Sequence, residues 1–177
     1  MELLIALVVG IIWSEIISHF GASILLHRYY CHKQFKVPVW FEWVGLFMLS
    51  VAYIRTPIGW VASHRMHHHH SDSEKDPHSA KHVGFWKVLL TTWDIPSIPP
   101  KYAKDLFANP RLVFFHKHHV KILLAHNIIS FLISPYFWLA YAVVPFVFAK
   151  IGFGLLNTIG HKTEGGANVP WLNFFIA

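Results

Sequence analysis

The sequence predicts an all-α integral membrane protein with about three membrane-spanning helices and a histidine-rich cytoplasmic cap. Charged residues make up only 14% of the 177 residues and hydrophobic residues make up 54%, whereas soluble domains are roughly 25% charged. The apolar residues gather in runs long enough to cross a bilayer as helices. Most of the 15 histidines cluster in the polar segments beside these runs. An ordinary soluble domain is therefore not expected.

The distribution of charge favours a membrane partner over a nucleic acid. The 15 lysines and arginines exceed the 9 acidic residues, which gives a formal net charge of +6. They are scattered between apolar runs, whereas nucleic-acid-binding proteins gather them on one stripe or face. A basic face against the membrane fits this pattern better, and no nucleic-acid partner is expected. The single cysteine, Cys31, has no partner for an intramolecular disulfide, so no disulfide framework is expected.

Residues 3–26 form the first expected membrane helix. The run LLIALVVGIIWSEIISHFGASILL is long enough to cross about 30 Å of hydrocarbon at about 1.5 Å per residue. No positive region precedes it, so a cleaved signal peptide is a poor alternative. Basic residues follow it directly, and the positive-inside rule places the next loop in the cytoplasm. Glu15 and His19, four apart on one face, are expected to pair, with a role in a substrate channel as the alternative.

The apolar run from Trp40 to Trp60 is not expected to cross the membrane. It carries Glu42 and Arg55 and contains Pro57, and these residues disfavour a clean span. The segment is expected to lie in the interface or to re-enter on the side from which it came.

The apolar run from Ile122 to Asn157 predicts a hairpin of two short helices. As one helix its roughly 36 residues would extend roughly 54 Å, which is nearly twice one bilayer core. A break near Ser134-Pro135 uses this length economically and returns the end of the run to the side from which it entered. The polar segment from about Ser63 to Lys121 is then the cytoplasmic cap.

The first histidine pair, in HRYYCH, poses a geometric problem. His27 and His32 are five apart, and five steps of about 100° leave them about 140° apart around a regular α-helix. They cannot both face one metal ion from such a helix. Either the helix ends between them or each histidine serves a different metal.

The second histidine cluster, HRMHHHH at positions 64–70, is better arranged for one site. Relative to His64, His67 lies about 60° to one side and His68 about 40° to the other, so the three share one helical face. His69 and His70 fall on the far side and are left out of the ligand set.

The clustering of imidazoles predicts a metal site. A lone histidine is more often a hydrogen-bonded or solvated polar residue, but several together suit Zn, Cu, Ni or Fe. No glutamate has a histidine three residues later, so the site is expected to be all-histidine or nearly so. The last candidate, His161, shares a helical face with Asn157, four residues before it. The candidate ligands are His27, His32, His64, His67, His68 and His161.

The chemistry of such a site narrows the function. No side chain removes hydrogen from an unactivated hydrocarbon, so a membrane enzyme that acts on alkyl chains needs oxygen activated at iron or copper. Iron with histidine ligands suits that task. The reaction consumes two external electrons, and the sequence has no GxGxxG motif or cysteine cluster for a redox cofactor of its own. An electron-carrying partner is therefore expected.

The histidine motifs and their surroundings resemble the membrane fatty acid desaturases, specifically the acyl-CoA or stearoyl type that introduces a first double bond. The matching stretches cover most of residues 20–161 and read HRYYCHKQF, WVASHRMHHHHSDSEKDPHSA, DLFANPRLVFFHKHH and NTIGH. The second stretch, with its DPH end, is the most specific of the four.

This resemblance implies one desaturase domain over residues 1–177, with two iron ions held by the six histidines. It further implies that Asn157 reaches iron through water. His78 matches a family histidine that orients metal ligands, with capping of the Asp76-Pro77 turn as the alternative. A basic interfacial face, and not metal binding, is expected for His116, His118 and His119.

The resemblance also implies a substrate, a partner and a location. The substrate is a saturated fatty-acyl chain on CoA or on a lipid. The electron donor is a small carrier such as a b-type cytochrome or a ferredoxin. The active site faces the cytoplasm, in a bacterial inner membrane or in the endoplasmic reticulum.

Among the departures from the family pattern, two bear on the site. Relatives usually carry two membrane helices before the first histidine pair, and this chain has one. The family also has a third motif, HxxHH, whereas no histidine follows His161 up to Ala177. We therefore expect the domain to be incomplete at its C-terminus, short of iron ligands, and inactive or mononuclear on its own.

Two other functions remain as alternatives. A histidine-rich membrane hydroxylase or ketolase would act on an alkane, sterol or carotenoid, although HxxxH at the first motif favours that group and this sequence has HxxxxH. A non-catalytic or decayed metal-binding membrane protein is the other. Lipid analysis separates them, because the three give monounsaturated chains, oxygenated lipids and an unchanged lipid profile respectively.

Overall fold

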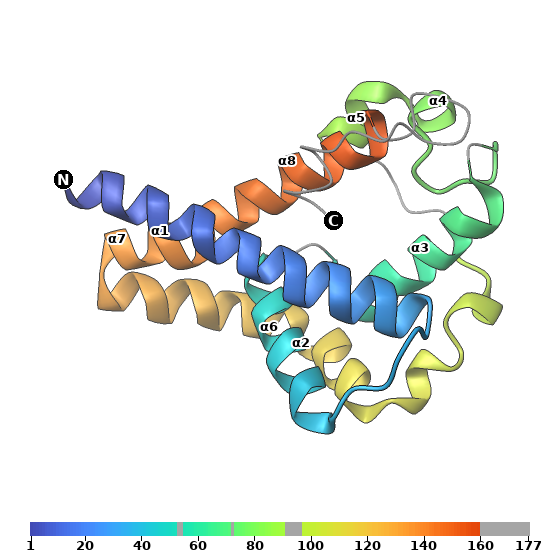
Figure 1. Ribbon diagram of the computed structural model, residues 1–177, viewed down its shortest axis with the longest axis horizontal. Helices are drawn as coiled ribbons and strands as arrows, with labels where there is room; N and C mark the ends of the chain where they lie inside the picture. The colour runs from blue at the N-terminus through green and yellow to red at the C-terminus, as the bar shows by residue number, and fades with distance from the viewer. Residues whose placement is uncertain (53–54, 72, 91–96, 160–177) are drawn as a thin grey trace.

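A computed structural model describes residues 1–52, 55–71, 73–90 and 97–159, and every regular element in these ranges is a helix (Figure 1). The predicted all-α class is confirmed. Among the described residues, two helical stretches are long and apolar enough to cross a membrane, and a third pair of helices qualifies only if it is taken as one bent span. The predicted number of about three agrees with this range. The third candidate, however, lies within residues 39–70, which were not expected to cross, and the first arm of the expected hairpin is not among the candidates.

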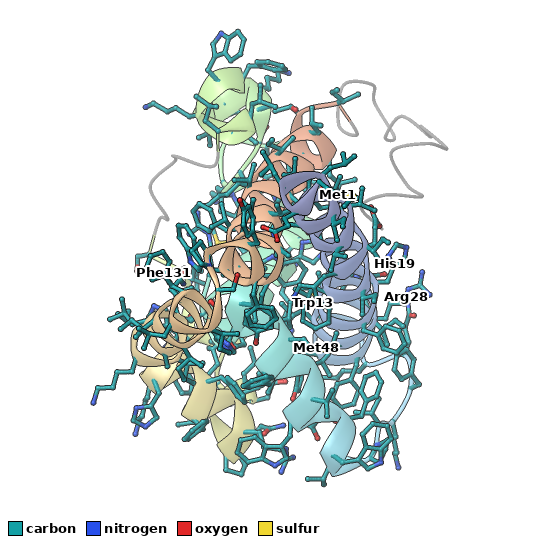
Figure 2. The ribbon with its side chains drawn as sticks, turned by 90° about the vertical axis from the view of Figure 1, so that its left-hand side faces the viewer. Met1, Trp13, His19, Arg28, Met48 and Phe131 are labelled. Carbon is teal, nitrogen blue, oxygen red and sulfur yellow. The ribbon has the colours of Figure 1, made fainter. Side chains whose placement is uncertain are left out.

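The first stretch is a continuous helix of 30 residues that changes its winding midway. Its first half is the α-helix α1 (Glu2–Ile16) and its second half is the π-helix η1 (Ile17–Cys31). The expected helix over residues 3–26 lies within it. Glu15 and His19 contact each other on one face, with 3.5 Å between a carboxylate oxygen and the imidazole Nδ1. Figure 2 shows His19 on the outer side of this helix and Trp13 turned inward.

The second stretch belongs to the predicted hairpin. Helix α6 (Pro110–Ile133) ends at Ser134, whose backbone is extended, and a new helical run starts at Pro135. That run comprises α7 (Pro135–Trp138), the π-helix η4 (Leu139–Val143) and α8 (Val144–Ile159). The break predicted at Ser134-Pro135 is confirmed. The first arm is longer than expected, because the Asn109 side chain caps a helix that begins well before Lys121.

The segment between the two stretches contains a sharp bend. Helices α2 (Val39–Ala52) and α3 (Pro57–His70) lie at 88° to each other. Helix α3 begins at Pro57, and the hydroxyl of Thr56 accepts a hydrogen bond from the Gly59 amide, which is the usual chemistry of a helix N-terminus. The bend agrees with the expectation that this run is not one clean span. That it does not cross the membrane stays a prediction.

Helices α1 and α8 pack closely at one end of the molecule and diverge toward the other (Figure 1). At the close end a side chain at Gly10 would meet Val144, with its Cβ only 2.7 Å from that residue. At the open end lie α3, the short helices α4 (Ala80–Val83) and α5 (Phe85–Leu89), and the histidine motifs. The divergence leaves room for a cavity between α1 and α8.

A buried carboxylate ties the helices together below this opening. Glu42 on α2 is only 2% exposed and accepts hydrogen bonds from the Tyr30 hydroxyl, from Asn109 Nδ2 at 2.6 Å and from Arg111 at 3.1 Å. The three donors come from η1 and from the start of α6. Because a buried charge is costly unless it is paired and hydrogen-bonded, this group fixes how α2, η1 and α6 meet.

Candidate metal centre

Four histidines from two helices converge at the open end of the molecule. His27 and His32 come from η1 and its C-terminal cap, and His64 and His68 come from α3. One ring nitrogen of each lies within 4.8 Å of the others. His27 and His64 are half-buried, whereas His32 and His68 are exposed. We call these four the histidine cluster.

The π-helix resolves the problem posed by the first histidine pair. The His32 amide donates a hydrogen bond to the His27 carbonyl at 3.0 Å, which is the i to i+5 bond of a π-helix. Five residues then close about one turn, so the two side chains stand on one side with ring centroids 4.7 Å apart. The separation of about 140° applies only to α-helical winding. Because η1 ends at Cys31, the alternative in which the helix ends between the two histidines is the one observed.

The nitrogen positions of the histidine cluster fit a bound cation. His68 Nε2 lies 3.0 Å from His64 Nε2 and 3.2 Å from His32 Nε2. A neutral imidazole nitrogen carries either one proton or one lone pair, so His68 Nε2 can make only one good hydrogen bond. Metal–nitrogen bonds of about 2.0–2.1 Å at right angles would separate two ligand nitrogens by about 3 Å. The observed distances therefore suit ligands that surround one metal ion.

A second group lies beside the first and is fully buried. It consists of His67, Asp76 and His78, with one potential ligand atom of each within 4.8 Å of the others. His67 Nδ1 lies 2.8 Å from an Asp76 carboxylate oxygen, and the His78 amide donates to the other oxygen at 3.0 Å. The rings of His67 and His78 stack at 4.2 Å. Asp76 thus holds both histidines.

Asp76 was expected only as part of a turn. In the structure its buried carboxylate also contacts His67, so it joins the two histidines in the second group. The expectation of a site that is all-histidine or nearly so stays a prediction. The only signal in the sequence was the DPH stretch, because nothing local indicates that Asp76 folds back onto α3. His67, which shares a helical face with His64 and His68, joins this second group and not the histidine cluster.

The remaining candidates lie as follows. Asn157 is buried on α8 and lines the same cavity as His27 and His64, with its Nδ2 donating to the Phe153 carbonyl at 2.7 Å. His161 falls outside the described residues. The histidines expected to stay out of the ligand set belong to neither group: these are His69, His70, His116, His118 and His119.

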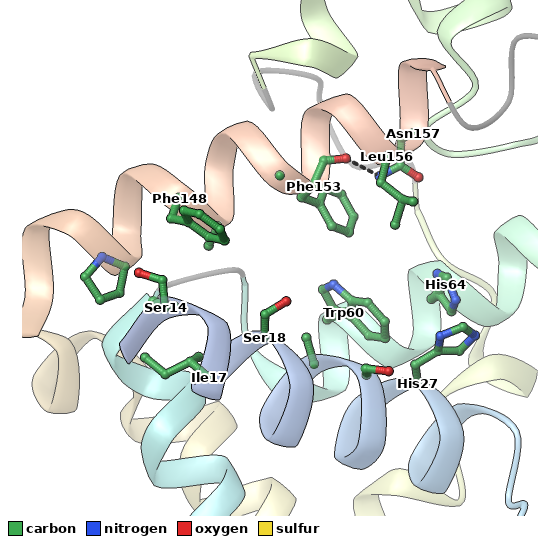
Figure 3. A pocket seen from close by; sticks show the side chains of 16 residues that line it. Ser14, Ile17, Ser18, His27, Trp60, His64, Phe148, Phe153, Leu156 and Asn157 are labelled. Atoms are coloured by element: carbon green, nitrogen blue, oxygen red, sulfur yellow. Dashed lines mark hydrogen bonds between the residues drawn. The ribbon is translucent and has the colours of Figure 1, made fainter. Parts of the chain in front are cut away.

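An apolar cavity leads from between the membrane helices to the histidine cluster (Figure 3). Its far end is lined by Ser14 and Pro145, and its near end by His27 and His64. Along its length, aromatic and small residues of α8 face η1 and α3; they include Phe148, Ala149, Gly152 and Phe153. The lining is mostly apolar, so the cavity suits hydrocarbon.

The fold and the site define an all-α membrane protein with a histidine-rich candidate metal centre at the end of an apolar cavity. No family model matches the sequence. Delta-9 acyl-lipid desaturase 2 of Arabidopsis thaliana is 44% identical over 179 aligned positions, covering 90% of this chain and 56% of that protein. The sn-1 stearoyl-lipid 9-desaturase of Anabaena variabilis is 29% identical over 148 aligned positions, which cover 80% of this chain and 54% of that protein.

A third relative, the acyl-CoA Delta(11) desaturase of Trichoplusia ni, is 34% identical over 117 positions, covering 60% of this chain and 32% of that protein. The chain belongs to the fatty acid desaturase family, as its histidine motifs predicted. It spans about half the length of the first two relatives.

Proposed function

We propose that this protein is a fatty-acyl desaturase, which converts a saturated chain, O2, two external electrons and two protons into an unsaturated chain and two water molecules, and whose histidines would hold the iron. The observation that supports this most directly is the apolar cavity that ends on His27 and His64. Few polar groups line it, so it favours an alkyl chain over a polar substrate. An acyl chain in this cavity would then lie beside these two candidate metal ligands.

Two iron ions are proposed, one for each group of ligands. The histidine cluster would hold one ion and His67 would hold the other, and His161 is proposed as a further ligand. Asn157 reaches iron through water, and His78 orients ligands within the second group. When bound, iron supplies the oxygen activation that no side chain provides.

The chain's own residues perform the remaining tasks. The imidazoles hold the metal without adding negative charge, since each neutral ring donates one lone pair. Phe148 and Phe153 line the cavity and exclude water from the alkyl chain. Asp76 accepts the Nδ1 proton of His67, which leaves Nε2 of that ring as the ligand atom.

The substrate class follows from the cavity and from the relatives. The relatives are named for acyl-lipid, stearoyl-lipid and acyl-CoA substrates. We propose a saturated fatty-acyl chain, carried on a lipid or on CoA, as the substrate here.

The electrons come from a separate carrier in this proposal. A small b-type cytochrome or ferredoxin would dock on basic side chains beside the centre, on the cytoplasmic face that the positive-inside rule favours. The membrane would be a bacterial inner membrane or the endoplasmic reticulum. Electron transfer should then slow as ionic strength rises, because salt screens the attraction between exposed charges. A rate that does not change with salt would contradict this docking.

Lipid analysis tests the proposal. The protein is expressed from its complete natural reading frame in a desaturase-deficient host, and the fatty acids of the membrane lipids are separated and identified. New monounsaturated chains are expected. The matched control is the His64→Ala variant, which should leave the lipids unchanged. Oxygenated lipids from the natural protein, or no change at all, would contradict desaturation.

A further inference from the structure

The guanidinium of Arg65 lies at the centre of a hydrogen-bond network beside the histidine cluster. Arg65 directly follows His64 on α3, and its side chain is only 14% exposed. Its Nη1 and Nη2 atoms donate to the two carboxylate oxygens of Asp105 at 2.7 Å and 3.1 Å. The same atoms also donate to the carbonyls of Tyr102, at 3.0 Å, and of Tyr30, at 2.7 Å.

The partners of Arg65 come from segments far apart in the sequence. Tyr30 lies at the end of η1, between the two histidines of the first pair. Tyr102 ends the short helix η2 (Pro100–Tyr102), and Asp105 precedes the short helix η3 (Leu106–Ala108). Lys33, which follows His32, adds an ion pair to Asp105 at 3.0 Å. One guanidinium therefore connects the first histidine pair, the second histidine pair and the linker after them.

The histidine cluster needs such a connection. Its four rings come in two pairs, one on η1 and its cap and one on α3. Imidazoles whose nitrogens converge add little stability by themselves, so they do not hold the two pairs together. A metal site binds tightly only when the surrounding side chains fix the positions of its ligands. The Arg65 network joins the two pairs, because Arg65 is adjacent to His64 and bonds the carbonyl of Tyr30, which lies two residues before His32.

We propose that Arg65 and Asp105 are positioning residues whose bidentate pair sets the spacing of the two histidine pairs, so that the site is formed before the metal binds. This inference rests on the proposed function, because it takes the histidine cluster as metal ligands. A planar guanidinium donates in a fixed fork, which a lysine ammonium cannot reproduce. The hydrogen bonds from Arg65 and Lys33 hold the pKa of Asp105 at about 2, so its carboxylate stays charged at neutral pH.

Cobalt titration of the purified full-length protein tests the inference. Co²⁺ is added to metal-free protein and its visible absorption gives both the affinity and the ligand geometry. The variants Arg65→Lys and Asp105→Asn are expected to bind Co²⁺ at least about tenfold more weakly, with an altered spectrum. The double variant should bind no more weakly than Arg65→Lys alone, because both substitutions break the same Arg65–Asp105 pair. The control Lys104→Gln changes an exposed side chain next to Asp105 and outside this network, and it should change affinity by less than about twofold.

The thermal unfolding temperature of each metal-free variant separates positioning from mere stabilisation. A purely structural role would lower that temperature while the folded protein kept its Co²⁺ affinity and spectrum, and this result would overturn the inference. If Arg65→Lys does not fold, Asp105→Asn, which keeps the shape of the side chain, decides the matter. Natural protein that binds no Co²⁺ would overturn the proposed metal centre itself. Natural protein that binds Co²⁺ no better than the two variants would overturn the positioning role alone.

Discussion

His67 Nδ1 lies 2.8 Å from a carboxylate oxygen of Asp76, and both side chains are buried. A carboxylate at this position fixes the tautomer of an imidazole, because the Nδ1 proton is held and the lone pair is left on Nε2. The same carboxylate accepts the backbone amide of His78. In the proposed metal site, this pair would leave Nε2 of His67 as the ligand atom.

Substitution of Asp76 should weaken metal binding. Asp76→Asn removes the charge and puts an amide in place of the acceptor of the Nδ1 proton, so Co²⁺ affinity at the second group is expected to fall about 10–100-fold. Equilibrium titration with metal-free protein measures the change. Glu74→Gln, an exposed carboxylate two residues earlier, is the matched control and should leave the affinity unchanged. Equal effects of the two variants would contradict the role of Asp76.

The ordering of histidines along α3 gives a second prediction. His64→Ala and His68→Ala should each lower the metal content of purified protein at least about tenfold, because both remove members of the histidine cluster. His69→Ala and His70→Ala should leave it unchanged. Metal analysis of the four variants measures this. Equal losses at all four positions would mean that the tract chelates metal without order.

The cavity gives a third prediction, which is specific to the substrate. Ala149→Trp places a large ring inside the cavity, and desaturation of added acyl chains should fall by about 100-fold because the chain no longer reaches its reactive position. Metal content should stay as in the natural protein. Ile151→Trp, two residues further along α8 and 54% exposed, is the control and should keep its activity. Full activity of the Ala149 variant would show that the substrate binds elsewhere.

A fourth prediction concerns stability. Glu42→Gln removes the charge that Arg111 pairs with in a buried position, and losing one partner of such a pair costs about 3–5 kcal/mol. Chemical unfolding in detergent micelles measures the loss. Glu2→Gln, at an exposed position, should change the free energy of unfolding by less than about 0.5 kcal/mol. A similar stability for both variants would contradict the importance of the buried pair.

The depressed pKa of Asp105 gives a fifth prediction. Its carboxyl has a pKa of about 2 in the folded protein, chiefly because of the hydrogen bonds from Arg65, against an ordinary value of 3.8. A lowered folded-state pKa stabilises the protein above the unfolded pKa, and this contribution disappears as the pH falls from 3.8 through about 2. The natural protein should therefore exceed Asp105→Asn in unfolding temperature by a constant amount above about pH 5, and the gap should close in acid. A gap that is constant down to pH 2 would contradict the assignment.

Much of the fold and part of the site could be predicted from the sequence. The apolar runs and Ser134-Pro135 predict the long helices and the hairpin, because hydrophobic length and a proline break are local signals. The face shared by His64 and His68 follows from α-helical periodicity. Asp76 and Arg65 could not be found in this way, since their roles depend on contacts with segments that fold back from elsewhere. The π-winding of η1 also has no simple local signal in the sequence.

The change from α to π winding at Ile17 divides one continuous helix into two parts that evolution can alter separately. The angular step between residues differs on the two sides of this point, so the lipid-facing stripe of α1 does not continue as a stripe along η1. Apolar residues of α1 can be exchanged for others without turning His27 and His32 away from α3. An inserted or deleted residue within η1 would instead change their phase, so this half of the helix should tolerate changes of residue type far better than changes of length.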